Sequence, residues 1–125
     1  MDSFSFFELR VYKESKDLVK LIYQLLENFP QCEIYALGDQ LRRAVISVPS
    51  NIAEGSGRFS YKEKNHFIEI AYGSLTEVLC QLDIAHDLKY ITDEEFNTVK
   101  ERINLIGKQL SGMRTSFQKQ IGANR

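Results

Sequence analysis

Apolar residues recur every three or four positions through most of the chain, which is the spacing of one buried face of an α-helix. The first such stretch predicts a helix over 10–29, and Pro30 ends it because the residue before a proline avoids the α-helical region. The second predicts a helix over 39–55, with Asp39 as its N-cap and a kink at Pro49. The apolar positions of the two faces are Val11, Leu18, Ile22, Leu25 and Phe29, and then Leu41, Ala44, Val45, Val48 and Ile52.

Two capping boxes open two longer helices in the second half of the chain. Ser-Tyr-Lys-Glu at 60–63 precedes a helix expected over 61–89, and Thr-Asp-Glu-Glu at 92–95 precedes one expected over 93–120. The last helix has the regular apolar spacing of a bundle seam. Four helices, short connections and no strand pattern predict a single all-α domain over 1–125, folded as an antiparallel up-down four-helix bundle.

A polar stripe runs along the second predicted helix. Its members recur every three or four residues and therefore share one side of that helix: Arg43, Ser47, Asn51 and Glu54. In the third helix Ser74, Glu77 and Gln81 interrupt an otherwise apolar stripe, and Gly73 would let the two backbones approach closely. We expect the two sets to face each other, with an ion pair between Arg43 and Glu77. The stripe is then either a buried network that fixes the register of the helices or a surface that recognises a partner.

Three segments carry a resemblance to a known family: Tyr35–Ala44 (YALGDQLRRA), Val48–Arg58 (VPSNIAEGSGR) and Ala71–Glu77 (AYGSLTE). They are similar to motifs of the four-helix bundle proteins known as 23S rRNA intervening-sequence proteins, or the S23 ribosomal protein family. The similarity extends from Leu9 to Ile91. It departs from the family pattern at Tyr12, where Trp is common, and before the second helix, where Gly-Asp replaces Thr-Ser.

The resemblance implies a left-handed antiparallel bundle that assembles into a ring-like homopentamer. The family includes proteins encoded inside insertions in bacterial 23S rRNA genes, and no enzymatic activity is established for it. The family is also similar to the accessory protein of diversity-generating retroelements, which binds a reverse transcriptase and nucleic acid. The resemblance therefore implies a bacterial, non-enzymatic protein whose partners are further copies of itself and RNA or a nucleoprotein of the reverse-transcriptase type.

Charge is distributed unevenly along the chain, although the net charge of −1 argues against a surface that is basic all over. The first 41 residues contain four basic and seven acidic residues, whereas the last 26 contain six basic and one acidic. The candidate contacts for nucleic acid or a partner are Arg42, Arg58, Lys100, Arg102, Lys108, Arg114 and Lys119. The alternative is an ordinary solvated face, and few aromatic residues lie beside these charges to stack on bases.

Patterns for catalysis and metal binding are weak. Glu-x-x-His at 63–66 and Asp-x-x-His at 83–86 match the spacing used in di-iron bundles, but they lie on one helix, about 30 Å apart at 1.5 Å per residue. The two cysteines form no C-x-x-C pair, and no serine has a histidine in register with it. We therefore expect no enzyme, metal, cofactor or small-molecule substrate. With no membrane-length apolar stretch and no basic leader, we expect a cytoplasmic protein without a membrane partner.

The resemblance, together with the basic residues of the second and last predicted helices, implies a non-enzymatic oligomeric bundle that binds RNA or a nucleoprotein. The alternative is an oligomeric scaffold whose only partners are proteins. In that case the polar stripe is purely structural.

Overall fold

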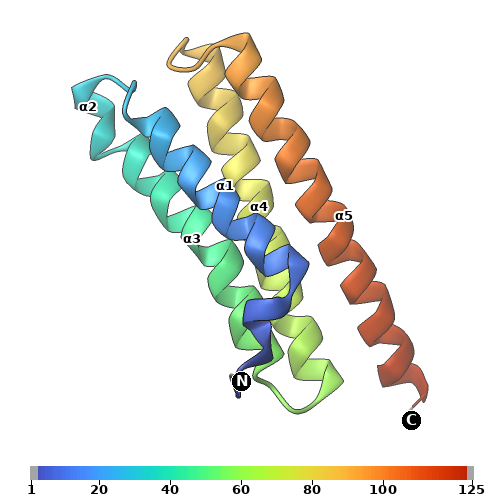
Figure 1. Ribbon diagram of the computed structural model, residues 1–125. Coiled ribbons are helices and arrows are strands. Elements are labelled where there is room, and N and C mark those ends of the chain that lie inside the picture. The colour runs from blue at the N-terminus through green and yellow to red at the C-terminus, as the bar shows by residue number, and fades with distance from the viewer. Residues whose placement is uncertain (1–2, 124–125) are drawn as a thin grey trace.

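The computed structural model describes residues 3–123, and four long helices dominate it. Residues 1–2 and 124–125 of the expected domain lie outside the described part. The long helices are α1 (Arg10–Leu26), α3 (Leu37–Ser56), α4 (Tyr61–Asp87) and α5 (Asp93–Ala123). They run alternately up and down (Figure 1), with α1 and α4 each packed against both α3 and α5. The prediction of an all-α fold is confirmed.

Two short helices were not predicted from the sequence: η1 (Ser5–Glu8) and α2 (Gln31–Ile34). The α2 helix occupies the connection after Pro30, where Arg42 Nη1 donates to the carbonyl oxygen of Ile34 at 3.0 Å. The same Nη1 donates to Asp39 Oδ1 at 2.8 Å. Asp39 lies inside the first turn of α3 and does not cap it. The N-cap is Ala36, and α3 begins at Leu37, two residues before the predicted bound of 39.

The capping boxes fix the starts of α4 and α5. Ser60 Oγ accepts a hydrogen bond from the backbone N–H of Glu63 at 3.1 Å. At α5 the exchange is reciprocal: the N–H of Thr92 donates to Glu95 Oε1 at 2.9 Å, and the N–H of Glu95 donates to Thr92 Oγ1 at 3.1 Å. These bonds satisfy donors that the first helical turn leaves free, which explains why these boundaries could be predicted closely.

One hydrophobic core fills the space between the four long helices. Its completely enclosed side chains include Leu18, Ile22, Leu41, Val45, Val48, Ile52, Val78, Val99 and Leu110. The α3 helix continues through Pro49, which is itself buried. At 1.5 Å per residue α5 is about 46 Å long and α1 about 26 Å, so α1 cannot cover the whole of α5. Figure 1 shows α1 beginning part-way along the bundle, and the buried positions of α5 end at Leu110.

No helix within residues 3–123 is both long enough and apolar enough to cross a membrane.

Candidate interaction surfaces

The centre of the polar stripe joins α3 to α4. Ser47 Oγ and Ser74 Oγ lie 2.8 Å apart, close enough to share a hydrogen bond. Asn51 Nδ2 donates to both the carbonyl oxygen and the hydroxyl of Ser47, at 2.8 and 2.9 Å. All three side chains are half-buried. The structure thus brings the two polar sets together at this level, as a small network at the edge of the core.

A second polar contact lies nearer the other end of the same seam. Gln81 is 6% exposed, and its amide nitrogen donates to Glu77 Oε1 at 3.1 Å and to Gln40 Oε1 at 3.4 Å. Its amide oxygen is buried with no partner in the described residues. Gln40 was absent from the predicted stripe, although it lies seven residues before Ser47 and therefore on the same side of α3.

The charged members of the stripe point outward. Arg43, Glu54 and Glu77 are exposed, and the expected pair between Arg43 and Glu77 is not among the ion pairs of residues 3–123. Glu54 instead accepts from Arg58 Nη2, in the turn that follows α3, at 3.2 Å. The prediction that these residues form a wholly buried network is therefore wrong. Helical spacing shows that they share one side of the helix, but it does not show whether another helix covers that side.

Gly73 is not the close-approach glycine that the sequence suggested. A Cβ built on Gly73 has no neighbour within 4 Å, because this position lies on the exposed side of α4. The close approach occurs at Gly55, where a Cβ would stand 3.0 Å from Phe67 Cβ and 3.3 Å from the Lys64 carbonyl oxygen. Gly55 is thus the position at which α3 and α4 require the absence of a side chain.

Exposed aliphatic side chains accompany these polar groups. Ile70 and Ile84 of α4 and Leu88, its C-cap residue, are 38%, 45% and 51% exposed. Helical spacing puts them beside Ser74 and Glu77. We use the term α3–α4 face for the surface made of Arg43, Ser47, Asn51, Glu54, Ile70, Ser74, Glu77, Ile84 and Leu88.

Three of the predicted contact arginines are already engaged within the chain. Arg42 holds Asp39 and the end of α2, as described above. Arg58 pairs with Glu54 and lies 4.6 Å from the centre of the Phe67 ring. Arg114 Nε pairs with Glu69 Oε2 at 2.8 Å, which ties α5 to α4.

The basic residues of α5 do not share one face. Arg102 lies seven residues before Gln109, which donates to Glu14 of α1, so Arg102 is on the side of α5 nearest α1. Lys100 lies two heptads before Arg114, on the side that pairs with α4. Lys108 and Lys119 point away from the bundle. The basic residues that are close together in the sequence of α5 therefore point in three different directions.

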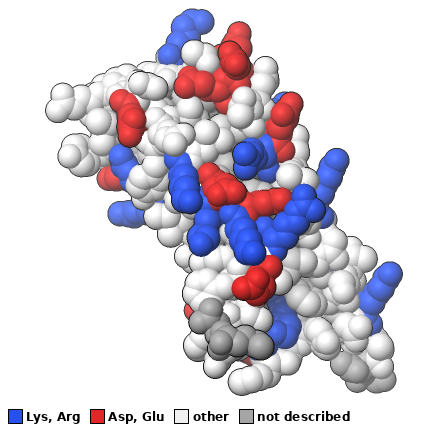
Figure 2. Space-filling view, viewed as in Figure 1, with Lys and Arg blue, Asp and Glu red and all other residues white. Residues whose placement is uncertain are grey.

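A group of lysines on α1 was not predicted from the sequence. Lys13, Lys16 and Lys20 are all exposed and recur at the spacing of one helix face. Figure 2 shows Lys and Arg side chains gathered across the middle of the molecule, with acidic side chains among them. The sum over the first 41 residues concealed this group, because it counts seven acidic residues against four basic ones, and Glu14 and Asp17 lie beside the lysines in the sequence. The spacing of the three lysines could have revealed it.

A comparison with known protein families identifies the family of this chain. The family described as 23S rRNA-intervening sequence protein matches residues 7–112. The chain belongs to the 23S rRNA-intervening sequence protein family. No curated protein matches the sequence.

The family match includes the α3–α4 face and the lysines of α1, but it ends before Arg114 and Lys119. The resemblance noted in the sequence is thereby confirmed. The two basic residues nearest the end of α5 are outside the region that the family has in common.

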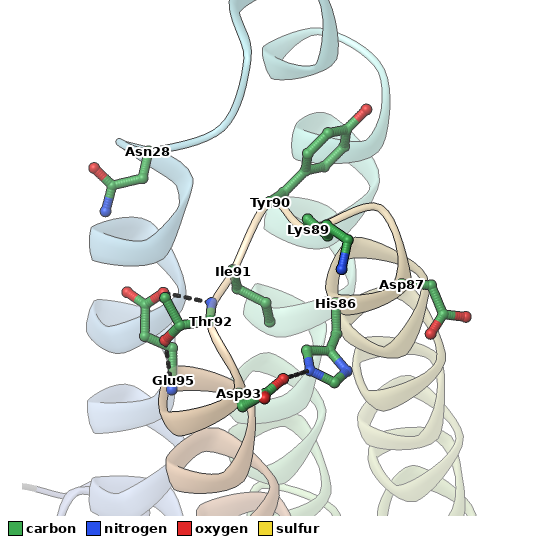
Figure 3. A pocket seen from close by; sticks show the side chains of 9 residues that line it. All are labelled: Asn28, His86, Asp87, Lys89, Tyr90, Ile91, Thr92, Asp93 and Glu95. Atoms are coloured by element: carbon green, nitrogen blue, oxygen red, sulfur yellow. Dashed lines mark hydrogen bonds and ion pairs between the residues drawn. The ribbon is translucent and has the colours of Figure 1, made fainter.

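The matched region also contains an open hollow where α4 turns into α5 (Figure 3). His86 Nε2 lies 2.6 Å from Asp93 Oδ1, and the His86 ring stacks on Phe96 with centroids 4.5 Å apart. Thr92 and Glu95 line the hollow but are occupied in capping α5. These contacts show that the residues lining the hollow stabilise the turn between α4 and α5.

The chemistry available at this turn is limited. Asp83, His86 and Asp87 have potential ligand atoms within 4.8 Å of one another, but both aspartates are exposed and His86 Nε2 is already bonded. Figure 3 shows Asp87 directed away from the hollow. Partial burial, and then the charge of Glu33, raise the pKa of the Tyr90 hydroxyl above its ordinary value.

Proposed function

We propose that this family member is a non-enzymatic protein that assembles with copies of itself, as a ring-like homopentamer, and binds RNA or a nucleoprotein partner. The proposed setting is the cytoplasm of a bacterium, because the family is named for a sequence within 23S rRNA, which bacterial ribosomes contain. The observation that carries the assembly part is the composition of the α3–α4 face.

Self-assembly is supported by what the α3–α4 face leaves exposed. Ile70, Ile84 and Leu88 expose between 38% and 51% of their surface beside the half-buried Ser47–Ser74 network. Arg43 has no ion-pair partner among residues 3–123, and Glu77 has none either. A surface that combines aliphatic side chains with unpaired charges of both signs suits a specific contact with another copy, in which Arg43 of one subunit meets Glu77 of the next.

Light scattering of the purified chain tests the assembly. A pentamer of 14.5 kDa chains would scatter as a particle of five times that mass. A monomer at all concentrations would contradict the proposal. An intermediate mass would correct the stoichiometry while leaving self-association in place.

RNA binding is tested by titrating a labelled RNA at several salt concentrations. Binding through phosphates should weaken linearly in a plot of log affinity against log salt concentration. Absence of binding at low salt would contradict the RNA part of the proposal.

A protein-only scaffold is the second candidate, and one observation favours it. The cations of α5 point in three directions, and Arg114 is neutralised by Glu69. This second function would be established if the purified chain assembles, binds no RNA and still binds a protein partner.

A further inference from the structure

The lysines on the outer side of α1 form a basic track, in which the exposed Asp17 lies on the same side of the helix. At 1.5 Å rise per residue, Lys13, Lys16 and Lys20 are spaced about 4.5 and 6 Å along the helix axis. All three are exposed. Lys13 makes one loose contact with Glu8, at 3.8 Å, and the other two are in none of the ion pairs of residues 3–123. The three ammonium groups are thus available to a ligand on one side of the molecule.

An aromatic cluster lies at the N-terminal end of this track. The Phe7 ring stacks on Phe6 with centroids 4.3 Å apart, and Tyr12 meets both rings edge-on at 4.9 and 6.2 Å. Phe7 remains 42% exposed. Lys16 Nζ lies 5.1 Å from the centre of the Tyr12 ring, which connects the aromatic cluster to the lysines.

The side of α1 opposite the lysines is completely enclosed. Leu18 and Ile22 are 0% exposed within the core. A helix that binds at a membrane surface needs its apolar side free to enter the lipid, and here that side is committed to the bundle. The charges on the outer side therefore fit a polyanion in solution better than a lipid bilayer.

A combination of a cationic track and an exposed ring favours unpaired nucleotides. Single-strand binding sites combine positive groups that follow the phosphates with aromatic rings on which bases stack. Bases in an RNA duplex are already stacked and paired, so an exposed Phe7 would gain little from one. The aromatic rings that are scarce beside the cations of α5 are present beside those of α1.

We propose that the outer side of α1 binds a single-stranded segment of RNA, with Lys13, Lys16 and Lys20 on its phosphates and Phe7 stacked on a base. This inference rests on the RNA binding proposed above and gives it a location and a class of RNA. It also replaces α5 with α1 as the principal basic surface.

Two triple variants with the same change in charge test the location. One is Lys13→Gln/Lys16→Gln/Lys20→Gln, and the matched control is Lys100→Gln/Lys108→Gln/Lys119→Gln on α5. Fluorescence anisotropy with a labelled unstructured oligouridine is measured from about 50 to about 200 mM salt, the range over which such binding weakens most visibly. The α1 triple should reduce the log–log salt slope by about 2, roughly 0.7 for each phosphate that is no longer neutralised, and the α5 triple should leave the slope unchanged.

Phe7→Leu tests the stacking separately. It should weaken oligouridine binding by about 5- to 100-fold, as expected when stacking on a single base is removed, without changing the salt slope. Affinity for a duplex RNA of the same length should be weaker than for the single strand and unaffected by this change. Circular dichroism of each variant checks that the helices are retained.

The outcomes separate the two proposals. Wild-type binding to RNA with equal weakening in the two triples, or with tighter binding to the duplex, overturns the α1 site while leaving RNA binding intact. Tighter binding to anionic vesicles than to RNA, abolished in the α1 triple, assigns the track to lipid and also overturns the inference. If the wild type binds no RNA, the proposed RNA function fails and the α1 site fails with it.

Discussion

The α3–α4 face and the outer side of α1 differ in what they leave exposed. The α3–α4 face presents Ile70 and Ile84 beside charges of both signs, whereas α1 presents three lysines and turns its aliphatic residues inward. Burial of apolar area gives a stable, close contact, while contacts to phosphates are strongly weakened by salt. The difference suggests two separate roles in one bundle, assembly on one surface and ligand binding on another.

The largest expected effect is loss of assembly when a charge is placed on the α3–α4 face. Ile70→Glu should reduce the scattering mass to that of the 14.5 kDa monomer, because the contact would have to bury an unpaired carboxylate. The control is Leu105→Glu on α5, since Leu105 is 40% exposed and Ile70 38%. Equal loss of mass in both variants would show that the α3–α4 face has no special role, and the comparison between the two surfaces would fail.

Two glycines sharpen the description of that face. Gly55→Ala should lower the free energy of unfolding by about 1–2 kcal/mol, because the new methyl group would press on Phe67 Cβ and on the Lys64 backbone. Gly73→Ala should raise it by roughly 0.5–1 kcal/mol, since alanine is the better helix former and open space receives the methyl group. Urea denaturation measures both. A destabilising Gly73→Ala would mean that this side of α4 is covered in the folded protein.

A smaller effect is expected from the serine pair that joins α3 to α4. Ser47→Ala removes the bond to Ser74 and one of the two Asn51 bonds, and should cost about 1 kcal/mol. A double-mutant cycle with Ser74→Ala should give a coupling of at least ~0.5 kcal/mol. Additive effects would mean that water satisfies each hydroxyl separately and that the pair contributes nothing to helix register.

The sequence allowed the helices to be predicted because their signals are local. The capping boxes at Ser60 and Thr92 satisfy donors within a single turn, so their effect does not depend on the rest of the fold. The short α2 helix could not be found in this way. It is held by Arg42, a residue eight positions beyond its last carbonyl, and such a contact exists only once the chain has folded back.

The candidate surfaces were harder to predict for a geometric reason. Helical spacing correctly placed Ser47 and Asn51 on one side of α3, but it does not state whether that side is covered. Arg43 and Glu77 were therefore assigned to an interior that the single chain does not provide. The basic residues of α5 are close in sequence but not on one face, and the lysines of α1 were hidden by acidic neighbours in the same segment.

The smallest predicted effect concerns a charge pair that belongs to neither surface. Arg114 and Glu69 are each about half exposed, at 49% and 47% for their side chains, so water and salt screen their attraction. Arg114→Gln should change the free energy of unfolding by less than about 1 kcal/mol, should leave the assembled mass intact and should not reduce the salt slope of RNA binding. Denaturation, light scattering and the anisotropy titration measure the three quantities on the same sample. If Arg114→Gln reduced the salt slope as much as the α1 triple does, RNA phosphates would be contacting α5. The ligand-binding surface would then include α5 as well as α1.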